Sequence, residues 1–253
     1  MKKGCILAVF AIVFAHSAFA VEFTLGGGVG ALMGGLFTRY TLTAKGSINN
    51  NPADILSTQE VDQLNFGGFL FLDATWAEVS FSVQGGSNTW TEAMNAKSGS
   101  AIVMPDNITT GTGSEMMLGF TVLGKYPIAL NEQFTFYPLA GVELQLAVFE
   151  YRQRFGREPY DRTDGVMEAD KDGNPCGISM WNSFLIDIGT GLDFYFHAPL
   201  YLKAELVYAF RLQTFYEVDA LEQAKVLVSA PEPKLAGLTS GPALKIGLGW
   251  RFY

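Results

Sequence analysis

The segment LYLKAELVYAFRLQ, residues 200–213, alternates between two kinds of side chain. Its even positions carry only leucine, alanine, tyrosine and phenylalanine, whereas its odd positions include Lys203, Glu205 and Arg211. Successive side chains of a β-strand point to opposite faces, so a period of two residues is the mark of a strand. This stretch predicts a strand with one apolar face and one charged face.

Seven further stretches show the same alternation, less regularly in five of them. The predicted strands are Glu22–Tyr40, Leu64–Ala74, Ala77–Ser87, Glu115–Lys125, Phe134–Tyr151, Phe184–Phe196, Leu200–Gln213 and Pro242–Phe252. Pro138 falls inside one of them and lacks the N–H that a closed sheet needs. We expect either that this strand begins at Leu139 or that a bulge accommodates the ring.

The connections between these strands alternate in length. Four are long, at about 22 to 29 residues, and three are short turns. This asymmetry in loop length is typical of outer-membrane barrels. The sequence therefore predicts an all-β fold: an eight-stranded antiparallel up-and-down transmembrane β-barrel with four long extracellular loops and three short periplasmic turns. No repeat or second domain is visible.

Alternation alone does not say which face points inward. A secreted lipocalin-like barrel would bury the apolar face and expose a densely charged one. Here the polar face is rich in small residues such as Gly189, Gly247 and Ser80, and the apolar face gathers aromatic residues near strand ends, including Trp181 and Phe196. Aromatic girdles around an apolar band favour a barrel embedded in a bilayer.

The first twenty residues have the pattern of an export signal. Lys2 and Lys3 precede an apolar run, and small residues stand at Ala18 and Ala20. We expect a signal peptide over 1–20, cleavage after Ala20, and a barrel domain over 21–253 in the cell outer membrane. Cys176 is then the only cysteine left, so an internal disulfide is excluded. The formal charge of −8 argues against nucleic acid as a partner.

The carboxy-terminal Gly247-Leu248-Gly249-Trp250-Arg251-Phe252 resembles the closing strand of small outer-membrane proteins, although Tyr253 follows Phe252 out of phase. The whole chain resembles eight-stranded barrels of the OmpW, OmpX or OmpA-domain kind, and OmpW-like proteins most. The resemblance implies that Trp250, Phe252 and Tyr253 form a signal for the barrel-assembly machinery. It also implies passage of small hydrophobic compounds.

Enzymes on small outer-membrane barrels, such as lipid A deacylases and palmitoyl transferases, need a histidine base near the outer leaflet. The chain has only His16, within the signal, and His197, in a predicted periplasmic turn. We therefore expect no enzymatic activity and no cofactor.

Charges on the polar faces fall at matched heights along neighbouring strands, which predicts a lumen charge network. In a narrow interior such charges should pair, because an unpaired buried charge is strongly disfavoured. We expect a two-layer salt-bridge plug, with Arg211 central to the upper layer; the alternative is hydrated charges lining an open channel. The predicted network is Glu143, Asp187, Asp193, Lys203, Glu205, Arg211, Lys245 and Arg251.

One long loop imitates the opening of a calcium-binding loop. Glu168, Asp170 and Asp172 alternate there, but Ser179 stands where the motif needs a bidentate glutamate. An acidic solvated turn is the simpler interpretation, and weak Ca²⁺ binding is the alternative.

Two functions remain open. The first is a non-enzymatic, narrow conduit for small hydrophobic molecules in the outer membrane. The second is a surface-exposed adhesin or host-factor-binding protein with a closed, salt-bridged lumen. The expected partners are outer-membrane lipid, the assembly machinery, and small hydrophobic solutes or host surface molecules.

Overall fold

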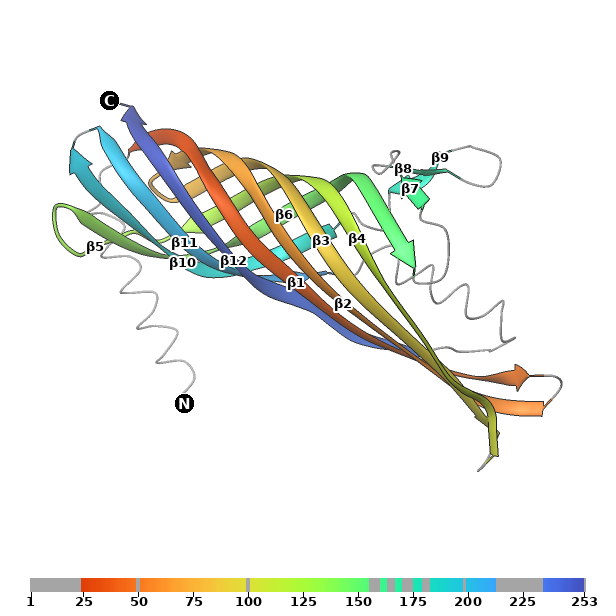
Figure 1. Cartoon of the computed structure of the whole chain (residues 1–253). Coiled ribbons are helices and arrows are strands. Elements are labelled where there is room, and N and C mark those ends of the chain that lie inside the picture. The colour runs from red at the N-terminus through yellow and green to blue at the C-terminus, as the bar shows by residue number, and fades with distance from the viewer. Residues whose placement is uncertain are drawn as a thin grey trace, which may run out of the picture.

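A computed structural model describes residues 24–48, 51–98, 101–154, 160–162, 167–169, 175–178, 183–197, 199–212 and 234–252. Eight long antiparallel strands close into a barrel, since each pairs with the next and the last pairs with the first (Figure 1). They are β1 (Leu25–Ile48), β2 (Asn51–Ala74), β3 (Ala77–Ser98), β4 (Ala101–Lys125), β6 (Phe134–Arg154), β10 (Ser183–His197), β11 (Leu200–Arg211) and β12 (Lys234–Phe252). The short strands are β5 (Ile128–Ala129), β7 (Tyr160–Arg162), β8 (Met167–Ala169) and β9 (Pro175–Ile178). The prediction of an eight-stranded antiparallel barrel is confirmed.

The outer surface of the barrel is a belt of exposed apolar side chains. Leu70, Ile188 and Leu206 are 58%, 54% and 58% exposed, while the residues that alternate with them point inward. Such an apolar surface is stable in contact with lipid. A closed ring of strands also leaves no unpaired backbone N–H or C=O group exposed to the lipid. The apolar face therefore points outward as expected, and the soluble, lipocalin-like alternative is wrong.

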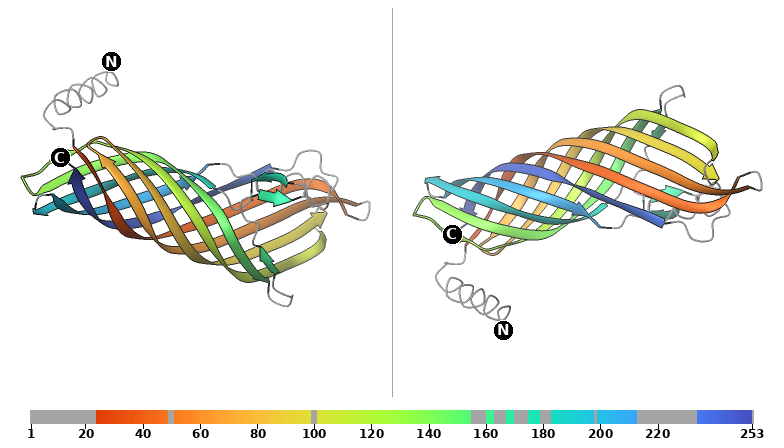
Figure 2. Two further views of the ribbon diagram at one scale, coloured as in Figure 1. Left: turned by 90° about the horizontal axis from the view of Figure 1, so that it is seen from above. Right: turned by 90° about the horizontal axis from the view of Figure 1, so that it is seen from below.

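The chain ends and the short connections lie at one end of the barrel. Leu25, at the start of β1, pairs with Phe252, at the end of β12 (Figure 2). The turn Thr75–Trp76, the connection 126–133, and Pro199, just before β11, lie at this same end. In the second of these, Asn131 Oδ1 accepts hydrogen bonds from the backbone N–H groups of Gln133 and Phe134 at 2.8 and 2.9 Å.

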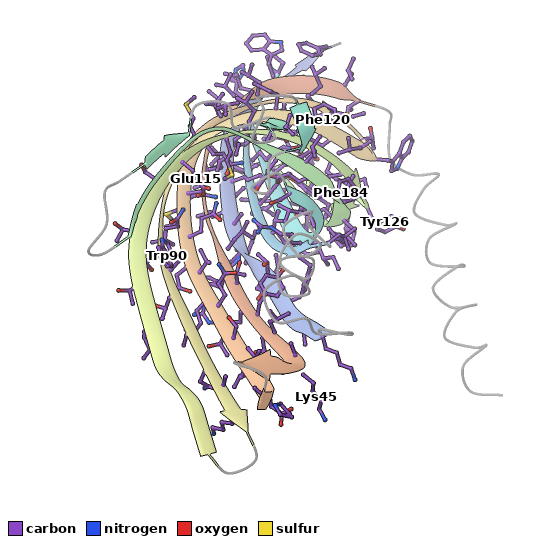
Figure 3. The ribbon with its side chains drawn as sticks, turned by 90° about the vertical axis from the view of Figure 1, so that its right-hand side faces the viewer. Lys45, Trp90, Glu115, Phe120, Tyr126 and Phe184 are labelled. Atoms are coloured by element: carbon purple, nitrogen blue, oxygen red, sulfur yellow. The ribbon has the colours of Figure 1, made fainter. Side chains whose placement is uncertain are left out.

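At the opposite end, two of the expected long loops are continuous strands. β1 pairs with β2 up to Ile48 and Asn51, and β3 pairs with β4 up to Ser98 and Ala101. We call residues 38–48, 51–62, 87–98 and 101–114 the extension, which projects beyond the barrel in Figures 1 and 3. The sequence prediction ended these strands early because lipid no longer imposes an apolar face there. The third connection holds β7, β8 and β9, and residues 213–233 lie outside the described part of the chain.

Pro138 lies within β6 without a bulge toward β10, where it pairs with Thr190. Its carbonyl accepts a hydrogen bond from the Tyr126 N–H, so its missing N–H faces the same neighbour. Pairing on that side passes from β4, ending at Lys125, to β5, beginning at Ile128. Both expected solutions for Pro138 are therefore wrong, because a break between two partner strands accommodates the ring.

Aromatic rings fill much of the lumen, and glycines on the neighbouring strands make room for them. Phe69 and Phe71 are 4% and 3% exposed and point inward from β2. A Cβ added at Gly30 would lie 2.4 Å from Phe69 Cε1, and one at Gly249 would lie 2.3 Å from the Tyr201 ring. Gly30 is the register partner of Phe69, and Gly249 is the register partner of Tyr201, so each ring packs over the bare backbone of the neighbouring strand.

Candidate functional site

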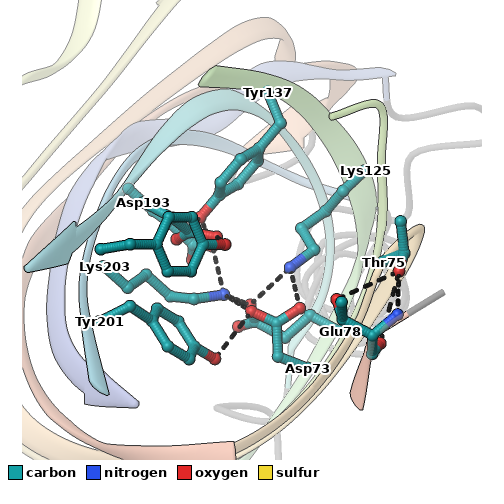
Figure 4. Close-up of polar contacts among 11 residues, drawn as sticks. Asp73, Thr75, Glu78, Lys125, Tyr137, Asp193, Tyr201 and Lys203 are labelled. Atoms are coloured by element: carbon teal, nitrogen blue, oxygen red, sulfur yellow. Dashed lines mark hydrogen bonds and ion pairs between the residues drawn. The ribbon is translucent and has the colours of Figure 1, made fainter. Parts of the chain in front are cut away.

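The lumen near the chain termini is crossed by one lysine. Lys203, on β11, is 0% exposed, and its Nζ contacts Glu78 on β3 and lies 2.6 Å from Asp73 on β2 (Figure 4). In a ring of eight strands, β11 and β3 stand on opposite walls. The contact therefore joins opposite walls of the barrel.

Further groups complete this layer, which we call the lower plug. Lys125, on β4, contacts Asp73 and lies 3.7 Å from Glu78, and Glu205 lies 3.4 Å from Lys203 Nζ. Two phenols donate hydrogen bonds. Tyr137 donates to Glu205 at 2.9 Å and to Asp193 at 3.2 Å, and Tyr201 donates to Asp73 at 3.2 Å. The lower plug comprises Asp73, Glu78, Lys125, Tyr137, Asp193, Tyr201, Lys203 and Glu205.

A second polar layer, the upper plug, surrounds Glu143 on β6. Glu143 Oε2 lies 3.9 Å from Lys245 Nζ on β12 and accepts a hydrogen bond from Thr121 at 3.3 Å. Its Oε1 accepts hydrogen bonds from Gln145 at 2.7 Å and Gln84 at 3.4 Å. Leucine and aromatic side chains, including Leu32 and Phe69, pack between the two layers.

The structure distributes the predicted charges between these layers. Asp193, Lys203 and Glu205 belong to the lower plug, and Glu143, Asp187 and Lys245 lie buried in the upper lumen. Arg211 is half-buried at the end of β11, and its expected place at the centre of the upper layer stays a prediction. Arg251 lies lower, with its guanidinium 3.8 Å from the centre of the Tyr195 ring.

Sequence reasoning missed Asp73, Glu78 and Lys125. All three are buried and lie beside the short turns, at inward positions of the period-two pattern. Their inward position in the period-two pattern is the signal by which the sequence could have identified them. It is obscured on β2, where Phe69 and Phe71 occupy the two inward positions before Asp73.

A polar cavity of about 290 Å³ opens below the lower plug. Asp73, Lys125, Asp193 and Arg251 line it together with Tyr195 and Tyr201. Asp73 and Lys125 in this lining pair with each other, and the lower plug forms the upper end of the cavity.

The other predicted sites are placed only in part. Trp250 and Phe252 are 50% and 49% exposed on the outer belt, and Tyr253 lies outside the described residues. Glu168 lies in β8, whereas Asp170 and Asp172 are also outside the described part of the chain. Within that part, no cluster of three or more His, Cys, Asp or Glu side chains suited to a metal ion occurs.

His197 ends β10 beside the short connection to β11, at the end where the termini lie. Among the described residues, none form a helix with the length and hydropathy to cross a membrane.

The outer face of the extension is largely polar, although Leu56 and Ile108 are exposed on it. Arg39 Nη1 lies 2.8 Å from Asp62 Oδ1, and Arg39 Nε lies 3.6 Å from Glu60 Oε2, with each side chain about half exposed. The hydrogen bond to Asp62 raises the pKa of the Arg39 guanidinium above its ordinary value. The apolar belt ends just below it, at Phe37 and Leu64.

No protein-family model matches the sequence, and no curated protein matches it. Among solved structures, the chain is similar to Ail, the attachment invasion locus protein of Yersinia pestis, crystallised with the heparin analogue sucrose octasulfate. That match has 11% identity and a TM-score of 0.29, covering 89% of this chain and 99% of Ail. The outer membrane protease OmpT of Escherichia coli matches at 6% identity, 92% and 99% coverage and a TM-score of 0.27. The outer membrane protein AlkL, solved in lipid bilayers, matches at 13% identity, 88% and 90% coverage and a TM-score of 0.24. The barrel assignment rests on this chain's own strand pairing.

Proposed function

We propose that this protein is an integral outer-membrane barrel with a closed lumen, and that it acts as a surface interaction protein through its extension. The observation that carries the proposal is the contact between Lys203 and Glu78, which joins opposite walls of the ring. An eight-stranded barrel is just wide enough for side chains to fill. The extension, by contrast, holds two long hairpins clear of the membrane and offers them to external partners.

A closed lumen favours surface interaction over the hydrophobic conduit, which the sequence analysis named first. A conduit through the whole barrel would need a passage past both plugs, whose members are buried and paired. A non-enzymatic role is supported by the position of His197, at the end of the barrel away from the extension. The expected partner is a host surface molecule, bound by the hairpins above the lipid head groups.

Shortening one hairpin tests this function. Thr41 pairs with Thr58, so replacing residues 42–57 with Asn-Gly leaves a two-residue turn that suits a β-hairpin. Both plugs lie outside this segment, so we expect the variant to fold and to reach the outer membrane. Bacteria that express it should lose adhesion to cultured host cells, compared with bacteria displaying equal amounts of the unmodified protein. Equal adhesion by both would refute a role for this hairpin.

A second candidate is favoured by the inner face of the extension. The buried side chains there are largely apolar: Tyr40, Ala44, Ala53, Ile55, Val61, Trp90 and Ala96. Such a lining suits apolar molecules that enter above the upper plug and leave sideways into lipid. Liposomes carrying the protein should then accumulate a fluorescent long-chain alkane derivative faster than empty liposomes. Under the surface-interaction proposal the two rates are equal.

A further inference from the structure

The polar cavity below the lower plug contains two opposite charges that have no ion-pair partner among the described residues. Its volume is about 290 Å³, and one water needs roughly 10–15 Å³, so the cavity is large enough for an organic molecule of dipeptide size. Of its charged lining, Asp73 and Lys125 contact each other, and Glu132 is exposed to solvent. No described cation lies within ion-pair distance of Asp193, and no described carboxylate lies within that distance of Arg251.

Asp193 is the buried, anionic side of this cavity. The residue is 5% exposed, and among the described groups it accepts hydrogen bonds only from two neutral phenols, those of Tyr137 at 3.2 Å and Tyr195 at 3.3 Å. Both lysines of the lower plug contact other carboxylates. Because the lower plug holds four buried carboxylates against two lysines, a further cation beside Asp193 is favourable.

Arg251 is the cationic side, and it lies on the face of the same tyrosine. Its guanidinium is 3.8 Å from the centre of the Tyr195 ring, and the hydroxyl of that ring donates to Asp193. The two charges are therefore held one side chain apart without contacting each other. A guanidinium that stacks on an aromatic ring keeps its N–H groups available, in the geometry that matches a carboxylate.

A neutral donor lies in the same lining. The Oδ1 of Asn131 accepts hydrogen bonds from the backbone N–H groups of Gln133 and Phe134, which fixes the orientation of the amide. Its Nδ2 donates to no described group. The Gln133 carbonyl accepts a hydrogen bond from the Tyr195 N–H at 2.8 Å, so this connection is held beside Tyr195.

We propose that this cavity binds a small zwitterion of dipeptide size, with one primary ammonium and one carboxylate. Asp193 accepts hydrogen bonds from the ammonium, and Arg251 donates to the carboxylate, with Asn131 Nδ2 as a further donor. A simple cation would leave Arg251 without a partner, and a simple anion would leave Asp193 without one. The lower plug closes the cavity above, so the ligand enters from the end of the barrel where the chain termini lie. This site is independent of the surface function of the extension.

Ligand-observed NMR titrations of the protein, purified from outer membranes into detergent micelles, test the proposal. The ligand is alanyl-alanine, compared with N-acetyl-alanyl-alanine, which lacks the ammonium, and alanyl-alaninamide, which lacks the carboxylate. The unmodified protein should bind alanyl-alanine at least roughly tenfold more tightly than either blocked compound, because a hydrogen bond between charged groups contributes about that much to affinity. Equal binding of all three compounds, or binding of none, would overturn the site.

Two variants assign the two ends of the ligand. Arg251→Gln should bind alanyl-alanine no better than alanyl-alaninamide and should still reject the acetylated compound, whereas Asp193→Asn should show the opposite pattern. The matched control is Arg39→Gln, which removes a guanidinium from the extension and should retain both preferences. Arg251 is only partly buried and lies outside the lower plug, so its variant decides the matter even if Asp193→Asn fails to fold. An Arg251→Gln protein that still prefers the free carboxylate would refute the site.

Discussion

The ionic contacts of Lys203 make it the residue on which the lower plug most depends. Its Nζ contacts Glu78, lies 2.6 Å from Asp73, and lies 4.8 Å from the centre of the Phe71 ring. Lys203→Met keeps most of the volume but removes one of the two lysines beside Asp73 and Glu78. Removing one partner of a buried pair costs about 3–5 kcal/mol. Urea unfolding in lipid vesicles should show a loss of that size.

The matched control for Lys203→Met is Arg39→Met. It also removes a cation from two carboxylates, but at a half-exposed site in the extension. Exposed pairs are worth about 0–1 kcal/mol, so this variant should unfold close to the unmodified protein. Equal losses in the two variants would show that Lys203 contributes no more than a surface charge.

Gly191 is required by the ring of Tyr137. A Cβ at position 191 would lie 2.2 Å from Tyr137 Cε2, and hydrogen bonds to Asp193 and Glu205 hold that ring in place. Overpacking a core costs typically about 1–3 kcal/mol, and we expect Gly191→Ala to lose this much stability in the same urea assay. Gly85→Ala is the control, because a Cβ there meets no atom within 4 Å. A Gly191→Ala variant as stable as Gly85→Ala would contradict the tight packing.

Among the elements, β12 closes the barrel and carries the proposed assembly signal. Phe252 is 49% exposed to lipid and pairs with Leu25, which is 44% exposed on the same belt. A charge near the membrane interface costs only about 0–1 kcal/mol, so Asp at either position should be tolerated in the folded state. If the assembly machinery reads Phe252, Phe252→Asp should be depleted from outer-membrane fractions and Leu25→Asp should not. Equal amounts of heat-modifiable protein from both variants would argue against the signal.

Sequence predicts the elements well where lipid covers them. The predicted strand Leu64–Ala74 has the roughly 9–11 residues of a tilted membrane strand, and its outward positions from Leu64 to Leu72 are largely apolar. Above Leu64 the same strand runs from Gln63 back to Asn51 through the extension, and its outward positions there include Asp62 and Glu60. Water on the outer face removes the apolar half of the alternation, so the pattern fades while the hydrogen bonding continues.

At the scale of the whole molecule, the sequence could predict the position of each charged side chain along the barrel axis. It could not predict which side chains on distant strands pair with one another. Counting along β10 and β11 places Asp193 beside Lys203, and these two residues are indeed opposite each other in register. The contact of Lys203 with Glu78 depends on how the closed ring sets β11 across from β3. No local pattern encodes that relation, so the sequence identified Lys203 and Glu205 but missed Asp73 and Glu78, the two carboxylates that contact the lysine from the other wall.

The closed barrel should not conduct ions, and a variant with an opened lumen should reveal the sign of the net charge in its interior. Seven buried carboxylates, Asp73, Glu78, Glu115, Glu143, Asp187, Asp193 and Glu205, face three buried lysines, Lys125, Lys203 and Lys245, among the described residues. We expect no steady conductance from the unmodified protein in a planar bilayer. The double variant Lys203→Ala/Tyr137→Ala removes two of the largest fully buried side chains and should produce small single-channel steps.

Those steps should be cation-selective, because the remaining interior is strongly negative and a narrow, low-dielectric passage enhances that field. The reversal potential in a KCl gradient measures the selectivity directly. Tyr208→Ala, which alters a side chain 44% exposed on the outer belt, is the control and should stay silent. Steady conductance in the unmodified protein would refute the closed lumen, and anion selectivity in the double variant would refute the negative interior.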